Sequence, residues 1–295
     1  MKPWERFLEK YVAFGQKPSR ESHARLFAPD AVIFHPGMPA PMPASHYVDF
    51  IVAGLRRLAD FHLIPTHWAV NGDTIFVEAR NTAIVNRRPV VWPATYVVTL
   101  REEMVVRGHA HYDRTELLAH FEPELANNVP NPHTLLLEGA AAYGGAVDDD
   151  PAYAASVHEK IVAPYIENGL RPDPQRFKQF YAPEAQMINP GFERPLRRDE
   201  LAGYYTSLTH QIEGLQLHLE RWAVSRGLLF MQWTVTGKIA GQQLRLANAD
   251  RFTLDSNLLA TEGVAYFDNL MLRAMLEPAL ARFRNVSFAD VRTAA

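Results

Sequence analysis

The chain has 295 residues, of which 47% are hydrophobic and 21% charged, a composition typical of a globular protein with room for two domains. It contains no cysteine, which excludes disulfides, thiolate metal sites and a cysteine nucleophile; this fits a reducing compartment, and we expect a cytoplasmic protein. A net charge of −3 without a long basic run argues against nucleic acid as a partner, and no apolar stretch approaches the ~20 residues that cross a membrane.

The first third of the chain predicts three helices followed by strands. Hydrophobic residues recur at helical spacing over residues 4–12, Ser19 is a candidate N-cap of a short second helix, and Ser45 of a third. Between these helices, residues 32–34 are expected to form a short strand, whereas the Pro-rich residues 35–43 are irregular. Four further strands are predicted at 62–70, 75–85, 90–101 and 104–112.

The second half predicts the same order of elements. Its first helix spans about residues 152–167, with a kink expected at Pro164. Asp173, followed by a proline, is the expected N-cap of a short helix, and Asp199 that of a longer one. Strands are expected from about 215 to 267, followed by a tail that is helical to about residue 284 and then irregular.

A repeat explains why the two halves agree. Residues 27–31 read Phe-Ala-Pro-Asp-Ala and are followed by His35-Pro36-Gly37, whereas residues 181–185 read Tyr-Ala-Pro-Glu-Ala and are followed by Asn189-Pro190-Gly191. The offset, 181 − 27 = 154, also places Trp68 on Trp222. This period is far longer than that of solenoid repeats, so the sequence predicts a duplicated domain.

The boundaries follow from the repeat and from the residues between its copies. We expect copy one at 1–123, a linker rich in Asn, Pro, Gly and Asp at 124–150, and copy two with a C-terminal tail at 151–295. Three helices followed by a mostly antiparallel sheet make each copy an α+β domain.

This order of elements, with the Ala-Pro-Asp/Glu-Ala and Pro-Gly motifs at their spacing, resembles the nuclear transport factor 2-like superfamily, which includes ketosteroid isomerase and the SnoaL-like polyketide cyclases. The resemblance covers roughly residues 4–122 and 155–278. It implies two tandem cone-shaped α+β barrels, each with a curved sheet around a cavity for a small molecule, and no cofactor. Members of the superfamily commonly pair through the outer sheet face, which implies an intramolecular pseudo-dimer and leaves further oligomerisation open.

The resemblance also assigns candidate catalytic positions. In ketosteroid isomerase, an Asp before the Pro-Gly-like turn is the general base, and a Tyr and a protonated Asp bind the oxyanion. The base position falls on His35 in copy one and on Asn189 in copy two. The family's Tyr, 24 residues earlier, falls on Tyr11 and Tyr165, and its oxyanion Asp falls on Tyr96 and Asp250.

Strand alternation adds further candidates to these positions. Counting from residue 96, the cavity face includes Asn81, Tyr112 and, in copy two, Trp233. Copy one carries small residues on this face, whereas Trp233 and Met231 are expected to fill copy two, which favours copy one as the active cavity. His109 and His111 point outward by the same count. They are therefore expected at a domain interface rather than in a metal site, because the sequence offers no third ligand at a fixed spacing from them.

These assignments lead to three functional hypotheses. The first is a cofactor-independent enzyme in which His35 takes a proton next to the carbonyl of a small, fairly apolar compound, as in an isomerase, cyclase or dehydratase, with Tyr11 and Tyr96 or Asn81 as oxyanion donors. The second is a non-catalytic small-molecule-binding or scaffold protein of the same fold. The third is a protein-interaction module, which needs an exposed apolar patch.

Structural roles are the alternative for the same residues. Tyr11 and Tyr165 lie on the apolar sides of helices and are as compatible with packed core tyrosines as with hydrogen-bond donors. His35 has the alternative of bonding only the backbone of its turn. For Asp250, a strand register shifted by one residue would move the carboxylate to the outer face.

Overall fold

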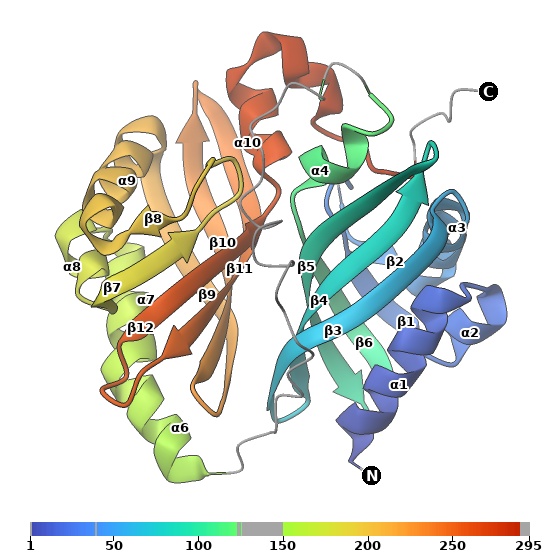
Figure 1. The fold of residues 1–295 in the computed structure, drawn as a ribbon, viewed down its shortest axis with the longest axis horizontal. Coiled ribbons are helices and arrows are strands. Elements are labelled where there is room, and N and C mark those ends of the chain that lie inside the picture. Colours follow the sequence, from blue (N-terminus) through green and yellow to red (C-terminus); the bar gives the residue numbers. More distant parts are fainter. Residues whose placement is uncertain (1, 39, 123–124, 126–149, 290–295) are drawn as a thin grey trace.

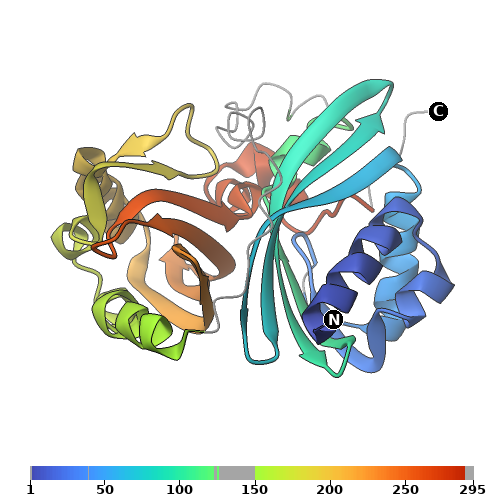
Figure 2. The same ribbon diagram turned by 60° about the horizontal axis from the view of Figure 1, so that its bottom comes forward.

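A computed structural model describes residues 2–38, 40–122, 125 and 150–289 and contains two units with the same order of elements (Figure 1). Apart from residues 125 and 150, the predicted linker lies outside the described residues. The helices that precede the long strands of each unit lie on the outside of the molecule, and the two sheets lie between them (Figure 2).

Copy one contains three helices, a six-stranded sheet and a short helix after the last strand. Its elements are α1 (Pro3–Gln16), α2 (Arg20–Ala24), β1 (Phe27–Phe34), β2 (Met42–Pro43), α3 (Ala44–Leu55), β3 (Ala59–Asn71), β4 (Thr74–Val85), β5 (Arg88–Arg101), β6 (Met104–His111) and α4 (Arg114–Leu118). The four predicted long strands are confirmed, whereas the predicted strand 32–34 begins earlier, at Phe27.

Copy two repeats this plan after an interrupted first helix. Its elements are α6 (Pro151–Val157), a π-helical turn (His158–Val162), α7 (Ala163–Leu170), α8 (Pro174–Lys178), β7 (Tyr181–Ile188), β8 (Leu196–Arg197), α9 (Arg198–Gln211), β9 (Glu213–Ser225), β10 (Leu228–Ile239), β11 (Gln242–Leu254), β12 (Ala260–Phe267), α10 (Asn269–Leu276) and a 3₁₀-helix (Pro278–Phe283). The irregularity expected at Pro164 takes the form of the π-helical turn that precedes it, since proline offers no N–H to the ladder.

Each sheet is an open, mixed sheet in which one pair of strands is parallel. The strand orders are β2-β1-β6-β5-β4-β3 and β8-β7-β12-β11-β10-β9. The parallel pairs are β1 with β6 and β7 with β12, and the other pairs are antiparallel. The α+β prediction is therefore confirmed, with sheets that curve around their helices without closing into a full barrel.

Two of the four predicted helix caps are correct. The Ser19 hydroxyl accepts from the Ser22 N–H at 3.1 Å, and the Asp173 carboxylate accepts from the Gln175 N–H at 2.9 Å. Ser45 and Asp199 instead lie in the first turns of α3 and α9. Both predictions are two residues late because β2 and β8 end directly at these helices and leave no loop for a capping side chain.

The two copies contact each other through the outer faces of their sheets. Ala69 and Phe76 of copy one pack with Ala223 and Phe230 of copy two, and the two Phe ring centroids lie 5.6 Å apart. Both pairs are related by the 154-residue offset. Equivalent residues that meet in this way indicate an approximate two-fold axis between the copies.

Polar contacts beside this apolar centre follow the same approximate symmetry. The Tyr266 hydroxyl donates to Glu78 Oε1 at 2.7 Å, and the equivalent pair places His111 Nε2 3.2 Å from Gln232 Nε2. The symmetry fails at Arg251, whose Nε lies 2.5 Å from Glu78 Oε2. His111 thus lies at the interface, as expected, and the described part of the chain holds no group of three or more His, Asp or Glu side chains placed to bind a metal.

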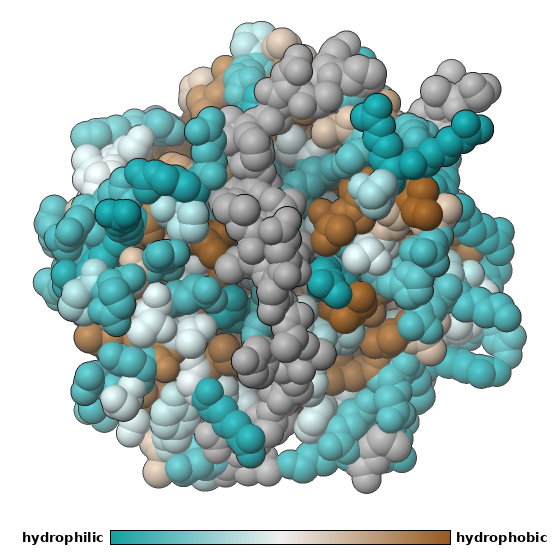
Figure 3. Space-filling view, viewed as in Figure 1, coloured by the Kyte–Doolittle hydropathy of each residue, from teal (hydrophilic) through white to brown (hydrophobic). Residues whose placement is uncertain are grey.

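Exposed large hydrophobic residues in the described ranges are spread over several elements. In the view of Figure 3, hydrophobic side chains lie in separate patches among hydrophilic ones. Large hydrophobic residues that are exposed in the described ranges come from four different elements: Val32, Ile84, Leu170 and Leu276. No helix in these ranges is long and apolar enough to span a membrane.

Candidate functional site

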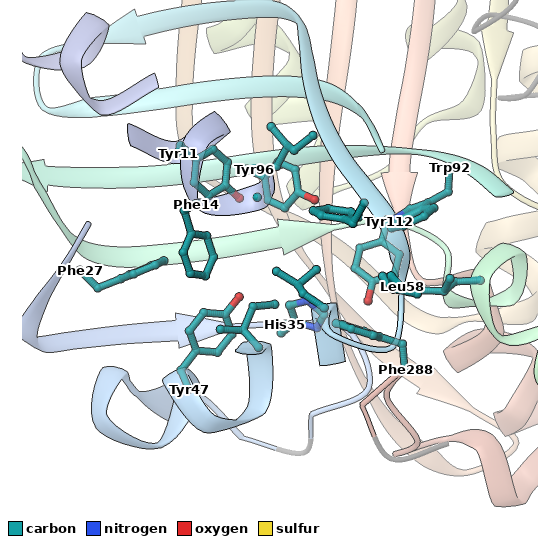
Figure 4. A pocket seen from close by; sticks show the side chains of 16 residues that line it. Tyr11, Phe14, Phe27, His35, Tyr47, Leu58, Trp92, Tyr96, Tyr112 and Phe288 are labelled. Atoms are coloured by element: carbon teal, nitrogen blue, oxygen red, sulfur yellow. The ribbon is translucent and has the colours of Figure 1, made fainter. Parts of the chain in front are cut away.

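Each copy has a cavity between its helices and the concave face of its sheet. The cavity of copy one has a volume of about 50 Å³. A buried water needs about 10–15 Å³ on this scale, so the space fits a few water molecules or a very small ligand. Four tyrosine hydroxyls and one imidazole face its centre (Figure 4), and they belong to Tyr11, Tyr47, Tyr96, Tyr112 and His35.

His35 follows directly after β1 and lines this cavity. Its Nδ1 lies 3.2 Å from the Pro36 carbonyl oxygen, so Nδ1–H donates to it and Nε2 keeps a free lone pair. The pKa of His35 is lowered to about 4, mainly by burial; the hydrogen bond to the Pro36 carbonyl opposes this shift and the charge of Arg114 adds to it. At neutral pH the ring is therefore an uncharged proton acceptor. The turn that holds it needs Gly37, whose φ is +83°.

The two tyrosines predicted from the resemblance lie side by side. Tyr11 on α1 packs edge-to-face on Tyr96 of β5, with ring centroids 5.4 Å apart. Burial raises the pKa of Tyr11 well above its usual range, so its hydroxyl stays protonated. The Tyr96 hydroxyl donates to Asn81 Oδ1 at 3.2 Å, and Asn81 is not among the residues that line the cavity. The hydrogen of Tyr96 is thus already engaged.

Tyr112 and Tyr47 complete the polar lining of the cavity. The Tyr112 hydroxyl is buried and has no hydrogen-bond partner among the described residues. Its ring packs edge-to-face on His35 at 5.4 Å. Sequence reasoning missed Tyr47 as a site residue, although it lies on the apolar side of the third helix, which by position must face the cavity.

The cavity of copy two contains a titratable carboxyl group. Asp250 lies on the concave side of β11 with its side chain in the cavity wall, and it accepts from Asn248 Nδ2 at 3.1 Å. Burial raises the pKa of Asp250 to about 7, although the Asn248 amide and the Trp233 indole oppose the shift. The inward register expected for this residue is confirmed, because Asp250 pairs with Ala265 just as Tyr96 pairs with Ala110.

Neutral polar groups surround this carboxyl group. Asn189 occupies the position of His35, and its Nδ2 is buried without a partner among the described residues. The Tyr165 hydroxyl lies 3.3 Å from that of Tyr205, also in the wall. The site can therefore donate hydrogen bonds to a ligand, but it has no base at the position where copy one has one.

The expectation that bulky residues fill copy two is wrong. Its cavity has a volume of about 80 Å³, larger than that of copy one. Trp233 and Met231 are fully buried, but neither lines the cavity, because Tyr165 covers Trp233 with its ring centroid 5.3 Å away. In copy one, large side chains from helices and from the C-terminal tail take the space that the small strand residues leave.

Comparison with known proteins places both copies in one family. The family model of the SnoaL-like domain matches residues 5–108 and 162–262, more than half of the chain. No curated protein matches the chain.

Several solved structures are similar to a single copy. A protein with a ketosteroid isomerase-like fold from Catenulispora acidiphila, in complex with trimethylamine, is 17% identical, with 39% of this chain and 90% of that chain covered and a TM-score of 0.36. IdmH, a putative polyketide cyclase from Streptomyces antibioticus, is 16% identical, with 41% and 98% covered and a TM-score of 0.37. A putative SnoaL-like polyketide cyclase from Jannaschia sp. CCS1 is 14% identical, with 39% and 91% covered and a TM-score of 0.34.

Proposed function

Since the chain belongs to the SnoaL-like domain family and carries two of its domains in tandem, we propose that copy one is an acid–base site that moves a proton on a small, fairly apolar carbonyl compound without a cofactor. The observation that carries this proposal is His35, an uncharged imidazole with a free Nε2 lone pair beside the unpartnered hydroxyl of Tyr112. A proton acceptor and a hydrogen-bond donor in one apolar cavity are what enolisation requires.

In the proposed step, His35 Nε2 takes the proton from the carbon next to the carbonyl. The C–H electron pair moves into the enolate, and its oxygen accepts hydrogen bonds from Tyr112 and Tyr11. Burial raises the pKa of both phenols well above the usual range, so they remain donors. Return of the proton from His35 to a different carbon completes an isomerisation. Tyr96, whose hydrogen is bound to Asn81, shapes the cavity instead.

For copy two we propose ligand binding without this chemistry. Asn189 stands where the base would be, and an amide takes up no proton near neutral pH. Its free N–H group, together with Tyr165 and Asp250, suits a ligand with a carbonyl or similar acceptor. The two copies would then form an intramolecular pseudo-dimer, an interpretation supported by the meeting of equivalent residues such as Phe76 and Phe230.

Deuterium exchange of butanone in D₂O, followed by NMR, tests the catalytic proposal. The protein should accelerate exchange at the carbons next to the carbonyl, and His35→Ala should lower the rate by about 100-fold or more, the usual contribution of a general base. His62→Ala, which removes a histidine with a side chain 43% exposed, is the matched control and should leave the rate unchanged. Butanone binding without exchange would instead favour a binding protein and refute the proposed chemistry.

A further inference from the structure

The C-terminal segment leaves copy two and packs on copy one. Leu280, Phe283 and Phe288 belong to the hydrophobic core of copy one. In Figure 1 the chain runs from α10, between the copies, toward the side of the molecule where α3 lies. By its position in the chain the segment is predicted to belong to copy two, since nothing in its residues specifies which domain it contacts.

A buried arginine of copy one holds the segment in place. Arg114 is 1% exposed, and its Nη1 donates to the carbonyl oxygens of Phe283, at 2.9 Å, and Val286. Its Nη2 donates to the Arg284 carbonyl at 3.1 Å, and its Nε to Asp268 at 2.7 Å. One buried side chain thus binds three backbone carbonyl groups within residues 283–286, an arrangement suited to a fixed position rather than a loose end.

The same contacts connect the tail to the turn that carries His35. A Cβ atom at Gly37 would lie 2.8 Å from both Arg114 Nη1 and the Val286 carbonyl oxygen. Beyond Val286, Ser287 is fully buried, and the Ala289 carbonyl accepts from Arg57 Nη1 at 2.7 Å. The residue between them, Phe288, is therefore held from both sides.

Phe288 enters the cavity of copy one beside His35. Its ring is 4% exposed and lies 5.6 Å, between centroids, from His35 and 5.9 Å from Phe50 (Figure 4). Gly54 on α3 makes room for it, because a Cβ atom there would come within 2.4 Å of the ring. Any side chain at position 54 would exclude the phenyl group from this place.

In copy two the same position is occupied by a different residue. The residue equivalent to Gly54 is Leu208, 154 residues later, and its side chain lines the cavity of copy two. A leucine on the helix thus stands where copy one has a glycine and a phenyl ring supplied by a distant part of the chain.

We propose that Phe288 is the residue that limits the size of ligand in copy one, by occupying a ring-sized subsite next to His35. The wild-type cavity of about 50 Å³ admits only a few non-hydrogen atoms, and removal of the phenyl group opens a site for a six-membered ring. This inference rests on the proposed use of the cavity for small ligands. It adds that the size limit comes from the C-terminal segment and not from the domain that holds the base.

Phenol binding, measured by isothermal titration calorimetry, tests this inference without relying on turnover. Phe288→Ala should bind phenol about tenfold or more tightly than the wild type, as expected when an apolar cavity of ring size is created. The double variant Gly54→Leu/Phe288→Ala, which copies the arrangement of copy two, should return to wild-type affinity. Gly54→Leu alone should expel the tail and speed tryptic cleavage after Arg284, whose carbonyl Arg114 covers in the wild type.

Two outcomes would overturn the assignment: Phe288→Ala binding phenol no better than the wild type, or the double variant binding as tightly as Phe288→Ala. Phenol that binds in copy two contributes equally to every variant, since its cavity is unaltered. If the wild type does not accelerate butanone exchange but the variants bind phenol as expected, only the proposed chemistry is refuted. If the wild type accelerates exchange but the variants do not bind phenol as expected, only the role of Phe288 is refuted.

Discussion

Replacement of Asp250 by asparagine should stabilise the protein at neutral and alkaline pH and have little effect in acid. The side chain is 4% exposed, and burial raises its pKa from 3.8 to about 7. Asparagine keeps the shape and the oxygen that accepts from Asn248. It removes only the ability to carry a buried negative charge.

The magnitude follows from the linkage between protonation and folding. Because the folded-state pKa of Asp250 lies above the unfolded-state value, the folded protein binds the extra proton between about pH 4 and 7, and stability falls as the pH rises through this window. At about 1.4 kcal/mol for each pH unit, the difference between 3.8 and about 7 amounts to about 4 kcal/mol above pH 7. Below pH 4 the carboxyl group is protonated in both states and the difference vanishes.

Urea unfolding of wild type and Asp250→Asn from pH 4 to 8, followed by tryptophan fluorescence, measures this difference. The free energy of unfolding of the variant should exceed that of the wild type by an amount that grows with pH. Asp49→Asn, which removes a carboxylate with a side chain 61% exposed, is the control and should show little change at any pH. A difference that stays constant from pH 4 to 8, or a less stable variant at pH 8, would refute the reasoning.

Two further predictions concern the base and the interface. Because the pKa of His35 is about 4, butanone exchange should be constant from about pH 5 to 8 and fall only near pH 4; an inflection near 6.5 would contradict a desolvated base. Arg251→Ala removes the guanidinium beside the buried Glu78 carboxylate and should lower the free energy of unfolding by about 3–5 kcal/mol in urea denaturation. Arg101→Ala, at an exposed ion pair with Asp30, is the control and should cost less than about 1 kcal/mol; equal losses would argue against the buried pair.

The fold was predictable because its signals repeat. Motifs such as Ala-Pro-Asp/Glu-Ala recur at one offset, and alternation along a strand specifies which side of the sheet a residue occupies. This logic placed Tyr96 and Asp250 on concave faces, where the structure has them. It also placed His111 at the contact between the copies.

The limits of prediction have equally definite physical reasons. Alternation along a strand predicts which face of the sheet a side chain occupies, but not whether another side chain covers it. Trp233 was therefore expected to line the cavity, whereas the ring of Tyr165 lies between the two. The irregular tail carries no pattern that reveals its partner, and Phe288 reaches copy one only because Gly54, far away in sequence, leaves a gap. The engagement of the Tyr96 hydroxyl with Asn81 depends on a cross-strand distance that composition does not encode.

The asymmetric ion pair between the copies determines which kinds of domain can pair with each other. The residue equivalent to Glu78 is Gln232, and the one equivalent to Arg251 is Val97. Two copy-one domains from different chains, paired in the same way, would bury two glutamates opposite valines, and two copy-two domains would bury two arginines opposite glutamines. Only unlike copies satisfy the charges, so this interface discriminates against the pairing of two like domains and favours the pairing of a copy one with a copy two.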